Sequence, residues 1–144
     1  MAITSAVCNS FKQEILEAEH NFSSSGGNTF NLALYDSGAD LSKSTTVYTT
    51  SEELATTGGY TAKGNALTSV TPVLDSDTAV CDFSNTSWTS ASFTARGCLI
   101  FNDSHASDAA VCAIDFGGDK TVTSGTFTVE FPAPAAGTAI LAIA

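Results

Sequence analysis

Arg96, Gly97 and Cys98 stand together in an apolar stretch, SFTARGCLIFN at residues 92–102. A cysteine thiolate beside a cation can act as a nucleophile when a base, usually histidine, lies within hydrogen-bonding distance. His105 follows Cys98 closely enough to face it across a hairpin. Because Cys98 opens the apolar run Cys-Leu-Ile-Phe, we instead expect its thiol in the core. A bulge at Gly97 would turn Arg96 outward, where it can pair with a carboxylate.

The other ionisable side chains form no catalytic or metal-binding motif in the sequence. Asp75 and Asp77 flank a turn but lack the run of oxygen ligands and the closing glutamate of a calcium loop. The chain has neither a Gly-x-Ser-x-Gly elbow nor a phosphate loop, and its cysteines do not form a CxxC pair. We therefore predict no catalytic residue, no metal and no cofactor. The cysteines, expected to be free and buried, are Cys8, Cys81, Cys98 and Cys112.

Charge and composition restrict the classes of molecule that the protein could bind. Fifteen acidic and five basic residues give the chain of 144 residues a net charge of −10. Without a basic cluster, we expect neither nucleic acid nor an anionic membrane as a partner. With 43% hydrophobic and 14% charged residues, the chain is expected to fold rather than remain disordered. No apolar segment approaches the ~20 residues of a membrane span. The first residues do not resemble a signal peptide, which predicts cytoplasmic synthesis.

The elements that would position these residues begin with one amphipathic helix, predicted over residues 4–19 with Thr4 or Ser5 as its cap. The Ser/Gly-rich loop at 23–28 ends this region, so residues 1–28 form an N-terminal unit that could tether the chain in an assembly. The apolar side chains that recur every fourth residue along the helix are Val7, Phe11 and Ile15.

From residue 29 onward the apolar period shortens to two, which is typical of strands. Short apolar segments with turn residues between them follow at even spacing to the end of the chain. The pattern predicts a mainly β domain over residues 29–144, an antiparallel sandwich of about eight short strands. The single helix would pack on an open face or at one end of this sandwich.

Five segments resemble small virion proteins of tailed bacteriophages, and together they cover nearly the whole chain. They are AVCNSFKQEIL, TFNLALYDSGADLSKSTTVYT, GGYTAKGNALT, VCDFSNTSWTSASFTARGCLIFND and AIDFGGDKTVTSGTFTVEFPAPAAGTAILAIA. These are signatures of a fold and carry no catalytic residues. The resemblance implies a non-enzymatic structural component of the virion, made in the host cytoplasm. It favours a capsid decoration or cement protein that binds the outer shell.

The resemblance leaves the position in the particle open, since a neck, collar or tail protein would fit as well. The expected partners are the major capsid protein or other virion proteins, and further copies of the chain in a homo-oligomer. A thiol near a subunit boundary could form an intermolecular disulfide, for which Cys8 is the candidate. The side chains expected to make assembly contacts are Val7, Phe11, Ile15, Tyr60, Ile140, Leu141 and Ile143.

A different class of function, a module that binds host glycans, would need exposed aromatic rings to stack on sugar faces. Trp88 lies in a Ser/Thr-rich strand, where its ring could face solvent. The candidates for such a platform are Trp88, Tyr35, Tyr48 and Tyr60.

Overall fold

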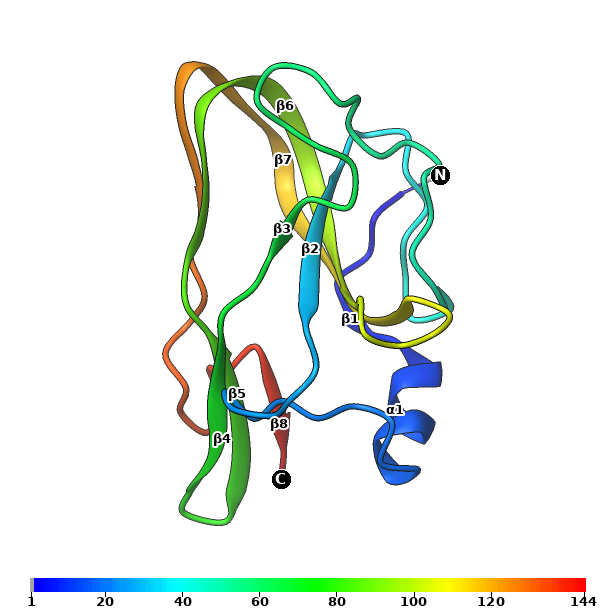
Figure 1. Cartoon of the computed structure of the whole chain (residues 1–144), viewed down its shortest axis with the longest axis vertical. Helices are drawn as coiled ribbons and strands as arrows, with labels where there is room; N and C mark the ends of the chain where they lie inside the picture. The colour runs from blue at the N-terminus through cyan, green and yellow to red at the C-terminus, as the bar shows by residue number, and fades with distance from the viewer. Residues whose placement is uncertain (1) are drawn as a thin grey trace.

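The computed structural model describes residues 2–144 and has two antiparallel sheets and one short helix (Figure 1). One sheet has five strands in the order β1-β7-β6-β2-β3, and the other has three in the order β4-β5-β8. This confirms the predicted mainly β fold with about eight strands. The elements are β1 (Ala6–Val7), α1 (Asn9–Leu16), β2 (Phe30–Tyr35), β3 (Asn65–Ala66), β4 (Ser69–Asp75), β5 (Thr78–Phe83), β6 (Thr86–Asn102), β7 (Ala109–Val129) and β8 (Leu141–Ile143).

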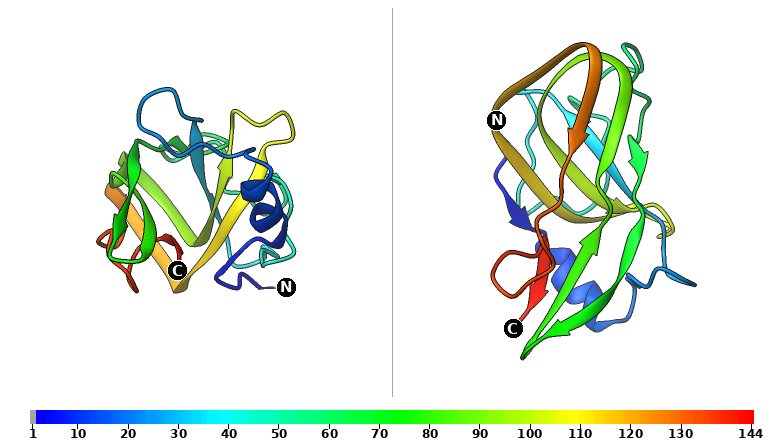
Figure 2. Two further views of the ribbon diagram at one scale, coloured as in Figure 1. Left: turned by 90° about the horizontal axis from the view of Figure 1, so that it is seen from below. Right: turned by 90° about the vertical axis from the view of Figure 1, so that its left-hand side faces the viewer.

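Strands β6 and β7 form one long hairpin that bends over at its middle and supplies two walls of the sandwich (Figures 1 and 2). The prediction of short strands is wrong here, because β6 and β7 are 17 and 21 residues long. Their pairing continues through register shifts, one of which lies between Ala95 and Gly97. Such bulges bend a strand and increase its twist without ending the ladder. In the sequence, the turn-type residues at the bend therefore look like loops between separate short strands.

Strand β2 lies inside the five-stranded sheet, between β6 and β3, and all six of its residues are buried. Its alternating sequence predicts one buried and one polar face. The second face is covered by the long connection at residues 36–64, which bonds back to the strand through Leu54 N–H and Leu34 C=O. Sheets covered on both faces lose the inside/outside contrast on which sequence alternation depends.

The helix α1 is only half as long as predicted. It begins at Asn9, is preceded by Cys8 at the N-cap position without a side-chain bond, and ends before Ala18, whose φ is 62°. Residues 6–7 form β1 instead, because the edge of β7 offers them backbone partners. Ser5 is not a helix cap; its hydroxyl accepts a hydrogen bond from the backbone of Asp115. Nowhere in residues 2–144 does a helix have the length and apolarity needed to cross a membrane.

At the lower end of the sandwich, α1 and the three-stranded sheet face each other (Figures 1 and 2). Aromatic side chains pack against one another in this region. The rings of Phe22 and Phe30 stack at a centroid distance of 4.2 Å, and Phe11 meets Phe22 edge to face at 5.9 Å. Phe83, from β5, joins the same cluster. This cluster fixes the segment that follows α1 against the sheet and forms the base on which the surface at this end is built.

Gly97 provides a test of the bend in the long hairpin. A Cβ added at this position would lie 2.4 Å from the carbonyl oxygen of Ile114 on the paired strand, so backbone must move to accept it. We expect Gly97→Ala to lower the free energy of unfolding by about 2 kcal/mol or more. Gly118→Ala, also in the hairpin, is the matched control, because nothing lies within 4 Å of its added Cβ. Chemical denaturation measures both, and equal stabilities would contradict the assigned close approach.

Candidate functional site

The Arg96–Cys98 stretch is part of the core and not a reactive-thiol site. Cys98 is fully buried, and this burial raises the pKa of its thiol well above the ordinary value. Arg96 turns outward at the predicted bulge and its Nε donates to Asp119 at 2.9 Å. His105 bonds to Glu19 and not to the cysteine. The expectations of a core cysteine and a carboxylate partner for Arg96 are both confirmed.

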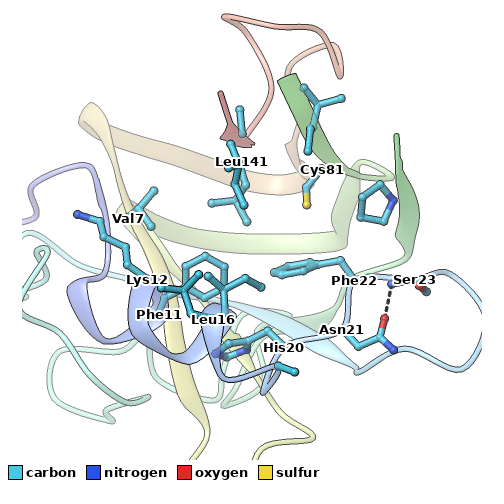
Figure 3. Close-up of a pocket in the computed structure, with 17 residues that line it drawn as sticks. Val7, Phe11, Lys12, Leu16, His20, Asn21, Phe22, Ser23, Cys81 and Leu141 are labelled. Carbon is cyan, nitrogen blue, oxygen red and sulfur yellow. Dashed lines mark hydrogen bonds between the residues drawn. The ribbon is translucent and has the colours of Figure 1, made fainter. Parts of the chain in front are cut away.

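The four cysteines, all within the described range, are free thiols. Cys8 is fully buried, its thiol donates to the carbonyl of Ser42, and burial raises its pKa to about 11. The expected role of Cys8 in an intermolecular disulfide is wrong, because the thiol lies inside its own subunit beside β7. Cys81 is different, since it is half-buried and its sulfur points into a surface groove (Figure 3).

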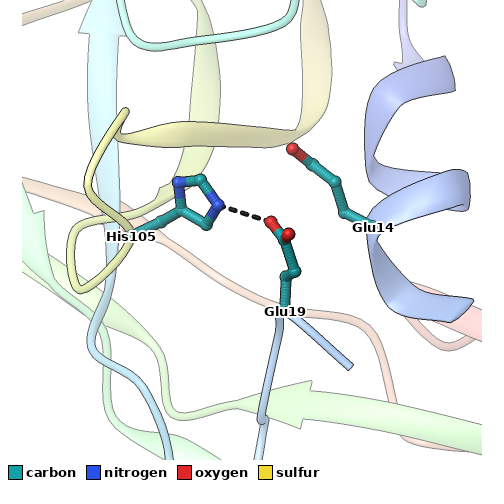
Figure 4. A group of neighbouring side chains, drawn as sticks. All are labelled: Glu14, Glu19 and His105. Atoms are coloured by element: carbon teal, nitrogen blue, oxygen red, sulfur yellow. Dashed lines mark hydrogen bonds and ion pairs between the residues drawn. The ribbon is translucent and has the colours of Figure 1, made fainter. Parts of the chain in front are cut away.

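Two histidines and two glutamates meet between the end of α1 and the β6–β7 turn. Figure 4 shows three of them, Glu14, Glu19 and His105. His105 Nε2 lies 2.6 Å from Glu19, and His20 Nε2 lies 3.1 Å from Glu14. The two imidazole rings stack with centroids 6.0 Å apart. Ligand atoms of Glu14, Glu19 and His105 lie within 4.8 Å of one another, which makes this group a geometric candidate for a metal site.

The hydrogen bonds in this group place a donor opposite Nδ1 of both imidazoles. Ser107 N–H donates to His105 Nδ1, so the proton of that ring is on Nε2 and faces Glu19. The amide nitrogen of Asn102 lies 3.0 Å from Nδ1 of His20, which places the proton of this ring on Nε2 as well. If a metal bound Nε2 of either imidazole, the proton of that ring would have to be on Nδ1. Nδ1 would then face another hydrogen-bond donor, which disfavours metal binding there. The group therefore joins the β6–β7 turn to the N-terminal segment.

The aromatic rings considered for a glycan platform are buried in the core or packed against it, so the orientation of Trp88 toward solvent that this alternative needs is wrong. Trp88 is 4% exposed and packs against Tyr60 and Phe93, while Tyr60 is 2% exposed. Tyr35 is fully buried, and Tyr48 stacks on the ring of Phe101. A ring in such a position cannot lie flat on a sugar. Its neighbours Ser87 and Thr89 are exposed, so the alternation along β6 places Trp88 on the inward face.

Glu53 holds the long connection between β2 and β3 in place. Its carboxylate accepts hydrogen bonds from the hydroxyls of Tyr48 and Tyr60 and from the backbone N–H of Lys63 at 2.7 Å. The Tyr60 hydroxyl also accepts the N–H of Leu34, which links the network to β2. Burial and the adjacent carboxylate raise the pKa of both tyrosines above its ordinary value. Sequence alone places Glu53 in a polar loop and gives no sign of this role.

An apolar groove of about 700 Å³ lies between α1 and the three-stranded sheet (Figure 3). Phe11, Phe22 and Leu141 form its interior, and Cys81 and Leu141 point down into it from β5 and β8. Its volume is within the ~300–1,000 Å³ of typical ligand sites, although this groove is open to solvent along one side. One wall comes from α1 and the segment after it, and the other comes from the three-stranded sheet, including β8 near the C-terminus.

Five of the seven predicted assembly contacts converge on this groove. Phe11 and Leu141 are buried in its interior, and Ile143 is 64% exposed at its rim. Of the two that lie elsewhere, Tyr60 is buried in the upper core and Ile140 is half-buried just before β8. The groove residues from the predicted set are Val7, Phe11, Ile15, Leu141 and Ile143.

The groove differs from the rest of the surface in charge and in polarity. Among the described residues that line it, Lys12 is the only fully charged side chain and carboxylates are absent, although the whole chain has a net charge of −10. Leu16, at the end of α1, is 87% exposed at the groove. Exposed apolar surface gathered in one place and lacking charge is typical of a binding surface. We therefore take this groove as the candidate functional site.

Removing the Glu53 carboxylate tests the network that supports the long connection. Glu53→Gln places an amide NH₂ among hydroxyl and N–H donors, so at least one buried donor loses its partner. We expect the free energy of unfolding to fall by about 1–3 kcal/mol. Glu52→Gln, at the exposed neighbouring position, should be within about 0.5 kcal/mol of the wild type. Denaturation curves for the two variants give the comparison, and a silent Glu53→Gln would contradict the role of this carboxylate.

The thiols provide a second test, because only Cys81 opens onto the groove. At neutral pH the rise of the Cys8 pKa from 9.0 to about 11 lowers its thiolate fraction about 100-fold, and burial blocks access as well. We expect a short pulse of iodoacetamide to modify Cys81 first in the folded protein and all four thiols after unfolding. Peptide mass spectrometry locates the adducts. Rapid labelling of Cys98 in the folded state would restore the reactive-thiol interpretation.

Comparisons with protein-family models, with curated proteins and with solved structures gave no match. The assignment of a function therefore depends on the geometry and charge of the groove and on the resemblance seen in the sequence.

Proposed function

We propose that the chain is a non-enzymatic structural component of a tailed-phage virion, a decoration or cement protein that binds the outer capsid shell. The observation that carries this proposal is the apolar groove between α1 and β8, which gathers most of the expected assembly contacts in one place. The sequence resemblance to small virion proteins supports the same assignment.

The distribution of polar groups also favours a structural role. The ionisable side chains with the closest contacts are used to hold segments of the chain together: Glu53 fixes the long connection, and His105 with Glu19 fixes the β6–β7 turn. The groove offers the opposite chemistry, apolar walls without a carboxylate. Such a surface gains free energy from burial, at roughly 25 cal/mol per Å² of apolar area, and does not need to transform what it binds.

A shell is a setting in which a modest contact of this kind suffices. Symmetry repeats each contact many times, so that weak single interactions produce a stable particle. The net charge of −10 opposes nonspecific contacts between free copies before assembly. The groove then supplies the short-range attraction once a partner surface is in register.

The proposal predicts that particles of the phage encoding this chain contain it on the order of hundreds of copies, as shell symmetry requires. Quantitative mass spectrometry of purified particles measures the copy number, and density for the intact particle locates the chain. A few copies to a few dozen would contradict the shell assignment and favour a neck, collar or tail position. Complete absence from purified particles would overturn the virion assignment as well.

A groove variant connects the copy number to the proposed surface. Ile143→Glu puts a carboxylate at the rim of the groove, and we expect at least about a 10-fold loss of incorporation. Val47→Glu is the matched control, because Val47 is also an exposed apolar residue but does not line the groove. Equal incorporation of the two variants would show that the groove is not the contact surface.

A further inference from the structure

We propose that the groove of one copy receives the β4–β5 hairpin of a second copy, so that the chain self-associates head to tail. This deepens the proposed function, on which it rests for its biological role, by naming one occupant of the groove. Four observations carry it: the exposed apolar residues of the hairpin, its charge, the open edges of the three-stranded sheet and the position of the hairpin relative to its own groove.

The β4–β5 hairpin projects from the lower end of the molecule beyond the rest of the sandwich (Figure 1). Val70, Val73 and Leu74, all on β4, are exposed, and Leu74 is 73% exposed. They are half of the large hydrophobic side chains that the described residues expose, and Leu16 and Ile143 at the groove supply two more. Apolar surface is thus concentrated on the groove and on the hairpin, which makes each a fitting cover for the other.

The two surfaces are also complementary in charge. The groove has Lys12 at its wall and no carboxylate among its described lining residues. The hairpin has Asp77, exposed in its turn, and Asp75 immediately before the turn. An acidic apolar hairpin entering this groove therefore brings its carboxylates toward one of the few cations of the chain. The same hairpin placed elsewhere on a surface of net charge −10 would meet mostly like charge.

Both edges of the three-stranded sheet are open to further pairing. In the order β4-β5-β8, the outer strands β4 and β8 each have a ladder partner on one side only. Pro72 and the adjacent register shift interrupt β4, so residues 73–75 form its regular part, and β8 also has three residues. Pairing β4 of one copy with β8 of the next would satisfy both edges and continue the sheet.

The hairpin already forms part of one wall of its own groove through Pro72 and Ala79, so its exposed edge cannot also fill that groove. Leu74 pairs with Ala79, and Ala79 pairs with Ile143, so β5 separates the exposed edge of β4 from β8. Cross-strand partners lie on the same face of a sheet, which puts Leu74 on the face that carries Ile143 at the groove rim. In a continued sheet, Leu74 of the second copy would extend this apolar face on the far side of β8.

Because the groove beside β8 and the exposed edge of β4 are different surfaces, the contact is heterologous, and heterologous contacts produce closed rings or open filaments instead of two-fold dimers. The mutual repulsion of copies that each carry −10 opposes association, and salt screens this repulsion. We expect the isolated chain to form oligomers larger than dimers, with a dissociation constant that falls at least about 10-fold between low and moderate salt.

Sedimentation velocity with two complementary variants tests the inference. Leu16→Glu disables the groove and Leu74→Glu disables the hairpin, and both side chains are so exposed that the fold should tolerate the change. Each variant alone should be monomeric. An equal mixture should form a heterodimer and nothing larger, because it contains one intact groove facing one intact hairpin. Val47→Glu, as the control, should assemble like the wild type, and circular dichroism confirms folding of each variant.

The inference is overturned if the wild type stays monomeric at every salt concentration, if either variant assembles like the wild type, or if the mixture forms no heterodimer. The inference is also overturned if the wild type forms a two-fold dimer and the mixture of the two variants does not restore association. Binding of the same proteins to purified particles is measured separately. If the chain is monomeric in solution and still joins particles, only the head-to-tail inference is contradicted, and the proposed virion function is not. A chain that self-associates but is missing from particles contradicts only the proposed virion function.

Discussion

The pairing of β6 with β7 is the constraint on which the rest of the structure depends. A straight strand of 17 residues would extend about 56 Å at ~3.3 Å per residue, too long for a compact domain of this size. The hairpin therefore has to bend, and it does so through bulges that preserve the ladder on both sides of the bend. Gly97 lies at one of these bulges, where the backbones approach too closely for a side chain. Once bent, the hairpin encloses the upper aromatic cluster of Tyr60, Trp88 and Phe93.

This arrangement leaves two regions that the hairpin alone does not cover, and the chain closes them by different means. The outer face of β2 is covered by residues 36–64, which have almost no regular structure and depend on Glu53 for their position. A half-buried carboxylate with three donors satisfies polar groups that would otherwise be left unpaired near the core. The lower end is covered by α1 and β8, which approach each other but leave an apolar groove between them. The cover of β2 is held by polar contacts and is complete, whereas the cover of the lower end is apolar and leaves the groove open.

The sequence predicts the class of fold and names five apolar residues that line the groove, but it predicts neither the groove nor the architecture that forms it. Alternating apolar residues identify the strands, and the apolar run after Gly97 correctly places Cys98 in the core. Sequence patterns fail where tertiary pairing overrides local preference: residues 6–7 join β7 as a strand although they fit a helical stripe. The bend makes each half of β6 and β7 resemble a separate strand. Glu53 is missed for a similar reason, because its three donors come from residues that only the fold brings together.

The convergence of five predicted contact residues on one groove has a physical origin in the placement of the chain ends. Each terminal segment is too short to bury its own apolar side chains: α1 has eight residues and β8 has three. Each can shield only one side of its apolar surface against the sandwich, and the remainder faces the opposite segment across the groove. If a single copy could close this gap, Leu16 and Ile143 would meet, yet both remain largely exposed. The missing cover must then be apolar and able to approach a site with Lys12 and no carboxylate. On this chain, the acidic apolar hairpin between β4 and β5 is a surface with both properties.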